Sequence, residues 1–166
     1  MIRLAQSEDL PEILEIFRIA RAYMAQQGNA GQWGPHHPSQ ALLEEDIAAG
    51  RLYVCTQQGK IHGVFAFIIG DDPTYQRIEN GAWRDCSPYG ALHRIASDGR
   101  VKGVFSQCMA YCKGQIGHLR IDTHQNNQTM RHLIEKHGFV HCGTIYVQDG
   151  TPRLAYEYTQ PGSQSR

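Results

Sequence analysis

The second half of the chain alternates runs of β-forming residues with helical segments, and this order constrains the fold more than any other feature of the sequence. Apolar and β-branched runs predict strands at 91–97, 116–122, 139–147 and 153–158, and helical spacing predicts helices at 103–113 and 130–137. The last two strands are joined across Asp149-Gly150, a dipeptide that favours a tight hairpin turn. No internal repeat or low-complexity tract interrupts this order, so a repeat architecture is excluded.

Two amphipathic helices are predicted before most of the strands. Ser7 is a suitable N-cap for the first, which Gly28 ends. Its apolar residues recur at helical spacing: Leu10, Ile13, Leu14, Phe17, Ala20 and Met24. A loop that contains Trp33 then leads to a second helix over 39–49.

A hairpin and a long irregular segment connect these helices to the second half of the chain. The hairpin pairs 51–56 with 61–69 across a polar turn. The segment 70–89 is longer than most loops of a compact domain, which suggests a functional role. We interpret it as a substrate-side segment.

The size and charge of the chain exclude several classes of protein. Its 166 residues correspond to one domain with its own core. Lys and Arg together number 16, and so do Asp and Glu together, which gives no net charge. The surface therefore lacks the excess positive charge that general nucleic-acid binding needs. No apolar run approaches the ~20 residues of a membrane-spanning helix. We therefore expect a soluble protein without nucleic-acid or membrane partners.

The start of the chain and its cysteines indicate the compartment. Residues 1–6 lack the basic and apolar regions of a secretory signal peptide, so we expect a cytoplasmic location. The five cysteines are an odd number without regular spacing, which does not fit a disulfide framework. We expect reduced thiols that act as small apolar side chains: Cys55, Cys86, Cys108, Cys112 and Cys142.

The segment 93–105 reads as a strand, a tight polar turn and the start of a helix. Backbone amides at a helix N-terminus lack helical partners and lie at the positive end of the helix dipole, so such a turn can bind a pyrophosphate. The same residues also fit an ordinary strand-to-helix loop with Arg and Lys on its surface.

A second segment, 119–139, favours the first of these readings. It combines a strand, Asn127 opening a helix, apolar Met130 and Leu133, and a closing Gly138-Phe139 pair. This pattern resembles the second signature of the GNAT N-acetyltransferase superfamily. In the segment before it, the Arg100-x-x-Gly103 turn is similar to the pyrophosphate turn of that family. The resemblance extends over residues 2–158.

The resemblance implies an α/β fold with a mixed, splayed β-sheet flanked by helices, the acyl-CoA N-acyltransferase fold. It implies an N-acetyltransferase domain over residues 1–159 and a flexible tail over 160–166. Acetyl-CoA would be the acetyl donor, held where two neighbouring strands part, with direct transfer to an amine. By the same resemblance the donor-binding residues are Ile95, Ala96, Arg100, Val101, Lys102, Gly103, Val104 and Asn127.

Two residues depart from the family pattern. Phe105 occupies a place where a Gly or Ala is usual, which predicts a more crowded backbone near the phosphates. Ile134 occupies the place where many members have a tyrosine that protonates the departing thiolate, so this acid is excluded. A thiol with a pKa of about 8.5 can leave with help from water or another group, or with no acid at all.

Asp122 and His93 are the candidates for proton removal from the amine. Asp122 ends a strand five residues before Asn127, where some family members have a catalytic Glu, and His93 is two residues from Ile95 in the donor strand. An ordinary aspartate is a poor base for an ammonium group, whereas histidine titrates near neutrality. The alternatives are that Asp122 caps a turn and that His93 is an interior hydrogen-bonded side chain. His124 is interpreted as a solvated loop residue.

Three aromatic residues are candidates for an acceptor pocket: Trp33, Tyr75 and Trp83. Each could instead plug the edge of the core. The acceptor itself, a small-molecule amine or a peptide amine, cannot be identified from the sequence. The sequence is silent on oligomeric state, although exposed late strands in the fold that the resemblance implies often pair across a homodimer axis.

Other functions were weighed against acetyl transfer. No His and Cys spacing completes a tetrahedral zinc site, so no metal is expected. A Gly-x-x-x-x-Gly-Lys-Ser/Thr loop is absent, which excludes a P-loop kinase or NTPase. The remaining alternative is a non-catalytic acyl-CoA-binding or protein-interaction domain of the same fold.

Overall fold

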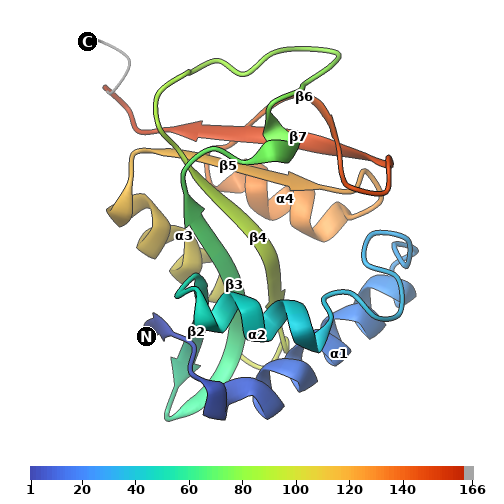
Figure 1. Cartoon of the computed structure of the whole chain (residues 1–166), viewed down its shortest axis with the longest axis vertical. Coiled ribbons are helices and arrows are strands. Elements are labelled where there is room, and N and C mark those ends of the chain that lie inside the picture. The colour runs from blue at the N-terminus through green and yellow to red at the C-terminus, as the bar shows by residue number, and fades with distance from the viewer. Residues whose placement is uncertain (163–166) are drawn as a thin grey trace. The chain divides into compact units, whose positions relative to one another are not determined.

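The computed structural model describes residues 1–162 and confirms the predicted fold class. Its seven strands pair in the order β1-β2-β3-β4-β5-β7-β6 (Figure 1). The strands are β1 Ile2–Leu4, β2 Leu52–Gln57, β3 Lys60–Ile69, β4 Gly90–Ser97, β5 His118–Thr123, β6 Val140–Tyr146 and β7 Pro152–Thr159. The α-helices are α1 Leu10–Gln26, α2 Gln40–Ala48, α3 Val104–Gln115 and α4 Gln128–Lys136, and two short 3-10 turns are η1 Ser7–Asp9 and η2 Pro73–Tyr75.

The chain forms two compact units, and β3, β4 and α3 each contribute residues to both. The first unit contains Met1–Phe67 and His93–Tyr111. The second contains Ile68–Leu92 and the described residues from Cys112 onward.

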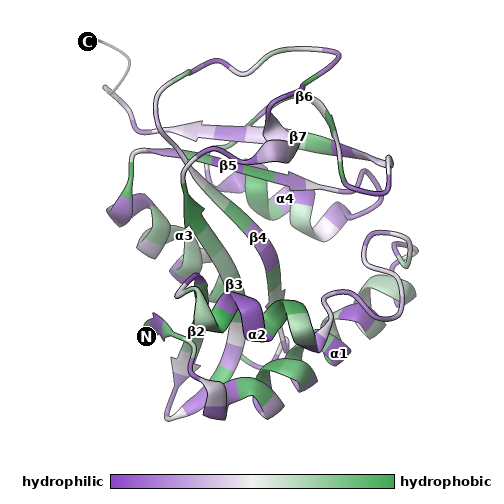
Figure 2. Cartoon of the chain, in the orientation of Figure 1, coloured by the Kyte–Doolittle hydropathy of each residue, from purple (hydrophilic) through white to green (hydrophobic). Residues whose placement is uncertain are grey.

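The first unit packs α1 and α2 against antiparallel strands. β1 pairs with β2, and β2 pairs with β3. The second half of β3 is strongly hydrophobic (Figure 2). The core gathers apolar side chains of both helices and the strands: Ala5, Ile13, Ile16, Phe17, Ala20, Leu43, Leu52, Val54, Ile61, Val64, Ala66 and Ala96.

The helix ends show which local predictions were right. Ser39 caps α2 as its oxygen accepts a hydrogen bond from the Leu42 amide at 3.1 Å. Ser7 does not cap α1, because it begins the 3-10 turn η1, and the capping box there is formed by Gln6 and Asp9. The strand β1 was not predicted, since three residues are too few to establish a period of two.

The second unit is built on β5, β7 and β6 together with the first residues of β4. β5 and β6 both pair antiparallel with β7. β4 runs parallel to β5, with the register Gly90–Leu119, Ala91–Arg120 and Leu92–Ile121. Both strands continue beyond these three pairs, β4 to Ser97 and β5 to Thr123.

The long segment 70–89 is an ordered cover for the second unit rather than an open loop. Glu79 forms an isolated antiparallel bridge with Thr144, and the Ala82 amide donates to the Cys142 carbonyl at 3.1 Å. A Cβ at Gly81 would lie 1.9 Å from the Cys142 carbonyl oxygen, so only glycine fits there. This part of the β6 edge is occupied by the chain itself. The homodimer stays a prediction, and Thr144 on this edge already pairs with Glu79.

The cysteines were predicted correctly with one exception. Four are buried free thiols in the interior: Cys55, Cys108, Cys112 and Cys142. Cys86 is exposed, because it lies in the irregular segment before β4, and so it is not an apolar filler.

Two further predictions concern the ends of the chain and the membrane. The Gln160 amide, in the predicted tail, donates to the Gly117 carbonyl at 2.7 Å, and residues 163–166 of that tail lie outside the described residues. The domain boundaries stay predictions. Within residues 1–162, no helix combines the length and the apolar character needed to cross a membrane.

Candidate active site

In the first unit, the polar turn between β4 and α3 is anchored to β3 by one aspartate. Asp98 accepts the Arg100 amide on Oδ1 at 3.0 Å and the His62 Nδ1–H on Oδ2 at 2.9 Å. Its own amide donates to the His62 carbonyl at 3.1 Å. A short Asx-type turn of this kind fixes the path of the backbone toward the helix.

Gly103 is the last residue before α3 and leaves space at its N-terminus. Its φ is +78°, and a Cβ built there would have no other atom within 4 Å. Its carbonyl accepts the Gln107 amide at 3.0 Å, the first bond of the helix. Since glycine has no side chain, it cannot cap the helix itself, and the dipole favours an anion at this position.

The start of α3 lies unusually close to β3. A Cβ at Gly63 would lie 2.4 Å from Cγ1 of Val104, the first residue of α3. A larger residue at position 63 would therefore push the helix start away from the sheet. Phe105 is only 7% exposed, so its ring packs into the interior while Gly103 keeps its open space.

The part of β4 in the first unit is not a regular strand. Arg94 has a φ of +53°, whereas His93 and Ile95 on either side are half-buried strand residues. A left-handed residue interrupts the alternation of side chains, as in a β-bulge. The role of His93 stays a prediction.

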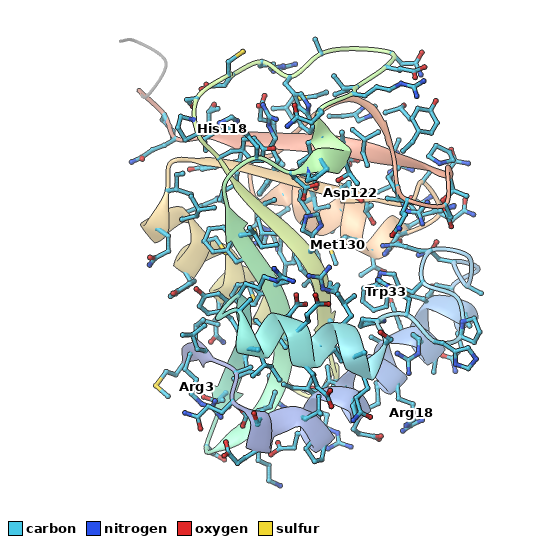
Figure 3. The ribbon with its side chains drawn as sticks, in the orientation of Figure 1. Arg3, Arg18, Trp33, His118, Asp122 and Met130 are labelled. Carbon is cyan, nitrogen blue, oxygen red and sulfur yellow. The ribbon has the colours of Figure 1, made fainter. Side chains whose placement is uncertain are left out.

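In the second unit, Asp122 of β5 binds a side chain from the long segment. The Tyr75 hydroxyl, from η2, donates to Asp122 Oδ2 at 2.7 Å. Complete burial, with the negative charge of Asp122, raises the pKa of Tyr75 well above its usual value of 10. The hydroxyl therefore stays protonated and holds the carboxylate, which lies near the end of β5 (Figure 3).

Arg153 interacts electrostatically with Asp122 and also with His124. Arg153 is 6% exposed; burial lowers its pKa, while the charges of Asp122 and Asp149 act in the opposite direction. Burial and the charge of Arg153 lower the pKa of His124, whose Nδ1 accepts the Asn126 amide at 3.0 Å. His124 was predicted to be a solvated loop residue. It is instead half-buried and hydrogen-bonded.

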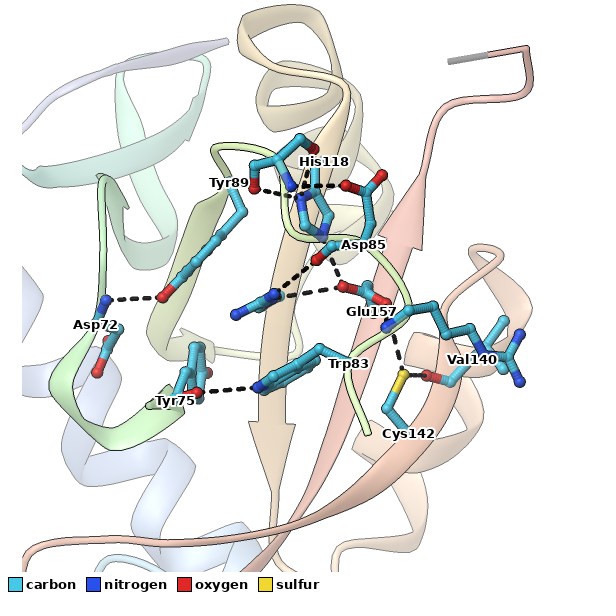
Figure 4. Close-up of polar contacts among 12 residues, drawn as sticks. Asp72, Tyr75, Trp83, Asp85, Tyr89, His118, Val140, Cys142 and Glu157 are labelled. Atoms are coloured by element: carbon cyan, nitrogen blue, oxygen red, sulfur yellow. Dashed lines mark hydrogen bonds and ion pairs between the residues drawn. The ribbon is translucent and has the colours of Figure 1, made fainter. Parts of the chain in front are cut away.

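A network of buried charges holds the long segment onto β5 and β7 (Figure 4). Glu157, 3% exposed, accepts the His118 Nε2–H at 2.7 Å and the Arg84 amide at 2.8 Å. Arg120 lies 3.5 Å from Glu157 and donates to the Asp85 carbonyl at 2.9 Å.

Aromatic rings of the long segment enclose the Arg120 guanidinium and connect the network to Tyr75. The guanidinium carbon lies 4.1 Å from the Trp83 ring centroid and 4.0 Å from that of Tyr89. Trp83 Nε1–H in turn donates to the Tyr75 carbonyl at 2.9 Å. The carbonyl of Tyr75, whose hydroxyl donates to Asp122, is therefore hydrogen-bonded to the same network.

The helix after β5 begins as predicted. The Asn127 side chain accepts the Met130 amide at 3.1 Å and caps α4. Ile134, in place of the family tyrosine, is fully buried in the core.

The predicted site residues divide between the two units. The first holds Trp33, His93, Ile95, Ala96, Arg100, Val101, Lys102, Gly103 and Val104, and the second holds Tyr75, Trp83, Asp122 and Asn127. Trp33 packs on Phe17 at 5.6 Å between ring centroids, whereas Tyr75 and Trp83 pack on each other at 5.3 Å. The acceptor-pocket role of these aromatics stays a prediction.

Sequence reasoning missed the residues that hold the site in place. Asp98 could have been found, because an Asp before a Gly is typical of a turn. Arg120 and Glu157 gave no local signal, since they meet only when β5 pairs with β7.

Among residues 1–162, no three His, Cys, Asp or Glu side chains are grouped as a metal site would require. The absence of a metal stays a prediction.

A mixed seven-stranded sheet flanked by helices, with a glycine turn leading into a helix after β4, is the arrangement of the acyl-CoA N-acyltransferase fold. Three comparisons with known proteins were made, and the one with solved structures supports this fold. No protein-family model matches the chain, and no curated protein matches it. Among solved structures, a GNAT-family acetyltransferase from Streptococcus agalactiae is 30% identical with a TM-score of 0.88, over 96% of this chain and 95% of that one. This chain belongs to the GNAT family of acetyltransferases.

More distant structures share the fold. A GNAT-family acetyltransferase from Listeria monocytogenes is 18% identical with a TM-score of 0.70, over 96% of this chain and 94% of that one. The yncA protein of Salmonella typhimurium, solved with its cofactor acetyl-CoA, is 14% identical with a TM-score of 0.63, over 98% and 94%.

Proposed function

We propose that this protein is an N-acetyltransferase that transfers an acetyl group directly from acetyl-CoA to the amine of a small molecule or peptide. The observation that carries the proposal is the turn before α3, where Gly103 leaves open space at a helix N-terminus in a chain of the GNAT family. Such a site favours a pyrophosphate, which acetyl-CoA carries.

The first unit offers the features that the donor needs. The turn Arg100–Gly103 would hold the pyrophosphate through backbone amides and the α3 dipole, and the exposed Lys102 would add a flexible positive charge. Ile95 and Ala96 would pair with the pantetheine through their backbone. When bound, acetyl-CoA supplies an acetyl group activated as a thioester. The donor roles of Val101, Val104 and Asn127 follow from the family resemblance.

Asp122 and His93 are proposed to serve the acceptor amine. An amine attacks only in its neutral form, so a proton must leave it directly or through water. The hydrogen bond from Tyr75 engages Asp122 Oδ2 and fixes the carboxylate, which favours a role in positioning the amine or a water molecule over one as a strong base. Proton acceptance then falls to His93 or to water.

A tyrosine acid at the family position is excluded. Ile134 occupies the family position, and Tyr75 has a pKa raised well above 10 and already donates to Asp122. We therefore propose that the thiolate leaves with help from water or without an acid, since thiols have pKa values of about 8.5.

The test of donor binding is a thermal titration with acetyl-CoA. At a concentration of about 100 times Kd, the expected stabilisation is about 2.7 kcal/mol. For a domain of this size, that corresponds to a rise in Tm of about 5–10 °C. ATP at the same concentration is the control for non-specific phosphate binding. A folded protein whose Tm does not respond to millimolar acetyl-CoA would contradict the proposal.

The test of turnover is release of CoA in the presence of a panel of small amines and peptide N-termini. We expect at least one amine to raise the rate above that with acetyl-CoA alone. Donor binding with no turnover on any amine would instead favour the non-catalytic acyl-CoA-binding domain.

Substitutions at the two acceptor residues should lower turnover with the amine that the panel yields. We expect Asp122→Asn and His93→Ala each to reduce kcat at least about tenfold, with little change in acetyl-CoA affinity, because neither residue is proposed to contact the donor phosphates. Tyr75→Phe, which removes the hydroxyl bound to Asp122, should have a smaller effect in the same direction. Wild-type kcat in both Asp122→Asn and His93→Ala would refute this assignment.

A further inference from the structure

One residue of the donor strand holds a strained backbone conformation. Arg94 lies in the middle of β4 with a φ of +53°, a region that residues other than glycine rarely adopt. Such conformations persist only where surrounding contacts impose them, and they gather at functional sites. The hydrogen bonds that the Arg94 side chain makes to Asp46 lie within the first unit.

The side chain of Arg94 is held by a buried carboxylate of α2. Arg94 Nε donates to Asp46 Oδ2 at 2.8 Å, and its Nη2 donates to Asp46 Oδ1 at 3.1 Å. This is a bidentate pair, which fixes the orientation of the guanidinium as well as its position. The Asp46 side chain is completely buried and that of Arg94 is 15% exposed.

A second arginine also binds Asp46, so one buried carboxylate is shared by two guanidinium groups. Arg51 Nε donates to Asp46 Oδ1 at 2.6 Å, and the Arg51 amide donates to the Asp46 carbonyl at 3.0 Å. Arg51 precedes β2 and does not belong to the donor strand. A buried carboxylate alone would be costly, so two arginines around one aspartate make a site that holds its geometry.

We propose that Asp46 is a positioning residue for the acetyl donor, because its bidentate pair with Arg94 holds β4 in the left-handed conformation that sets the backbone of Ile95 and Ala96. The inference rests on the proposed function, in which these two backbones pair with the pantetheine. A relaxed strand at Arg94 would rotate the peptide groups that follow. Misplacement by about 1 Å is enough to cost a large part of binding or rate.

The test compares acetyl-CoA affinity in a set of matched variants. Asp46→Ala should raise the Kd for acetyl-CoA at least about tenfold. Adding Arg94→Gly to Asp46→Ala should restore Kd to within about threefold of wild type, because glycine adopts a φ of +53° without a clamp. Arg51→Ala, which removes the other ion pair of Asp46, should leave Kd within about twofold, although it should lower stability.

The rescue distinguishes positioning from a general contribution to stability. If Asp46 only stabilised the fold, the double variant would bind acetyl-CoA no better than Asp46→Ala, because Arg94→Gly restores no contact. Unchanged Kd in Asp46→Ala, or a folded double variant that stays weak, would overturn the inference. If Asp46→Ala does not fold, Arg94→Ala against Arg94→Gly makes the same comparison, and equal affinities would overturn it.

A second readout does not depend on acetyl-CoA. Crystal structures of Arg94→Ala and Arg94→Gly report φ at position 94 directly. We expect Ala to relax to a negative φ and Gly to keep the positive one. A positive φ retained in Arg94→Ala would show that the clamp is not needed. Failure of the wild-type protein to bind acetyl-CoA would refute the proposed function, and this readout would still decide the role of Asp46.

Discussion

Replacing Gly103 by Glu is expected to lower the affinity for acetyl-CoA at least about 100-fold with the fold retained. The new carboxylate would stand where the pyrophosphate is proposed to meet the helix N-terminus. Two unit charges about 4 Å apart repel by about 4 kcal/mol at an effective dielectric constant of about 20. A loss of 100-fold needs only about 2.7 kcal/mol, so the repulsion is large enough even if the side chain partly turns away. Isothermal titration calorimetry of the folded variant with acetyl-CoA measures this loss of affinity.

Two variants separate this effect from backbone strain and from general charge. Gly59 has a φ of +77° and, like Gly103, no atom within 4 Å of a Cβ, so Gly59→Glu adds the same strain and the same charge in the β2–β3 turn. Its affinity should stay near that of wild type. Lys102→Ala should weaken binding only a few-fold, since an exposed ammonium contributes about 1 kcal/mol or less. Equal affinities for Gly103→Glu and Gly59→Glu would mean that the donor is held elsewhere.

The order of the elements was predictable because the signals are local. Ser39 and Asn127 are three residues from the amides that they cap, so the cap and its helix can be read in one short segment. Gly103 is likewise recognisable as the residue between a polar turn and a helix. The long segment 70–89 was identified as more than a loop, although its position over β6 was not.

The contacts of the candidate site were not predictable for the opposite reason. Tyr75 and Asp122 are 47 residues apart, and Arg84 and Glu157 are 73 apart, so no local pattern relates them. Arg94 belongs to a run that reads as an ordinary strand, so its positive φ could not be predicted. The side chain that binds it, Asp46 of α2, is 48 residues away in the sequence. Burial patterns predict which residues enter a core, but they do not predict which charges meet there.

Glu157→Gln is expected to lower the free energy of unfolding by about 3 kcal/mol or more. Removing one partner of a buried ion pair typically costs 3–5 kcal/mol, roughly, because the remaining charge loses its compensation. Here the carboxylate serves two side chains, His118 at 2.7 Å and Arg120 at 3.5 Å, and it is 3% exposed. Urea denaturation followed by circular dichroism measures the change. Glu15→Gln breaks an exposed pair with Arg18 and should leave stability nearly unchanged.

The same carboxylate should make stability depend on acidic pH. Burial opposes its charge, but the hydrogen bonds from His118 and the Arg84 amide, with the charge of Arg120, outweigh burial and hold the pKa of Glu157 below its usual 4.5. A depressed carboxyl pKa stabilises the folded state fully above the unfolded pKa, and this contribution is lost as pH falls through the folded pKa. The unfolding free energy of the wild type should therefore decrease below about pH 4.5, more steeply than that of Glu157→Gln.

A double-mutant cycle with Arg120→Met identifies the source of the effect. Arg120 lies between the Trp83 and Tyr89 rings, and Trp83 donates to the Tyr75 carbonyl, so a loosened Arg120 should also loosen the residue that binds Asp122. We expect the stability losses of Glu157→Gln and Arg120→Met to be non-additive by about 1 kcal/mol or more, as for residues in one network. In Glu157→Gln, the rate of hydrogen exchange at the Arg84 amide should increase by a larger factor than the rates at the amides of β5. Additive losses with unchanged exchange at Arg84 would mean that Glu157 does not hold the long segment on the sheet.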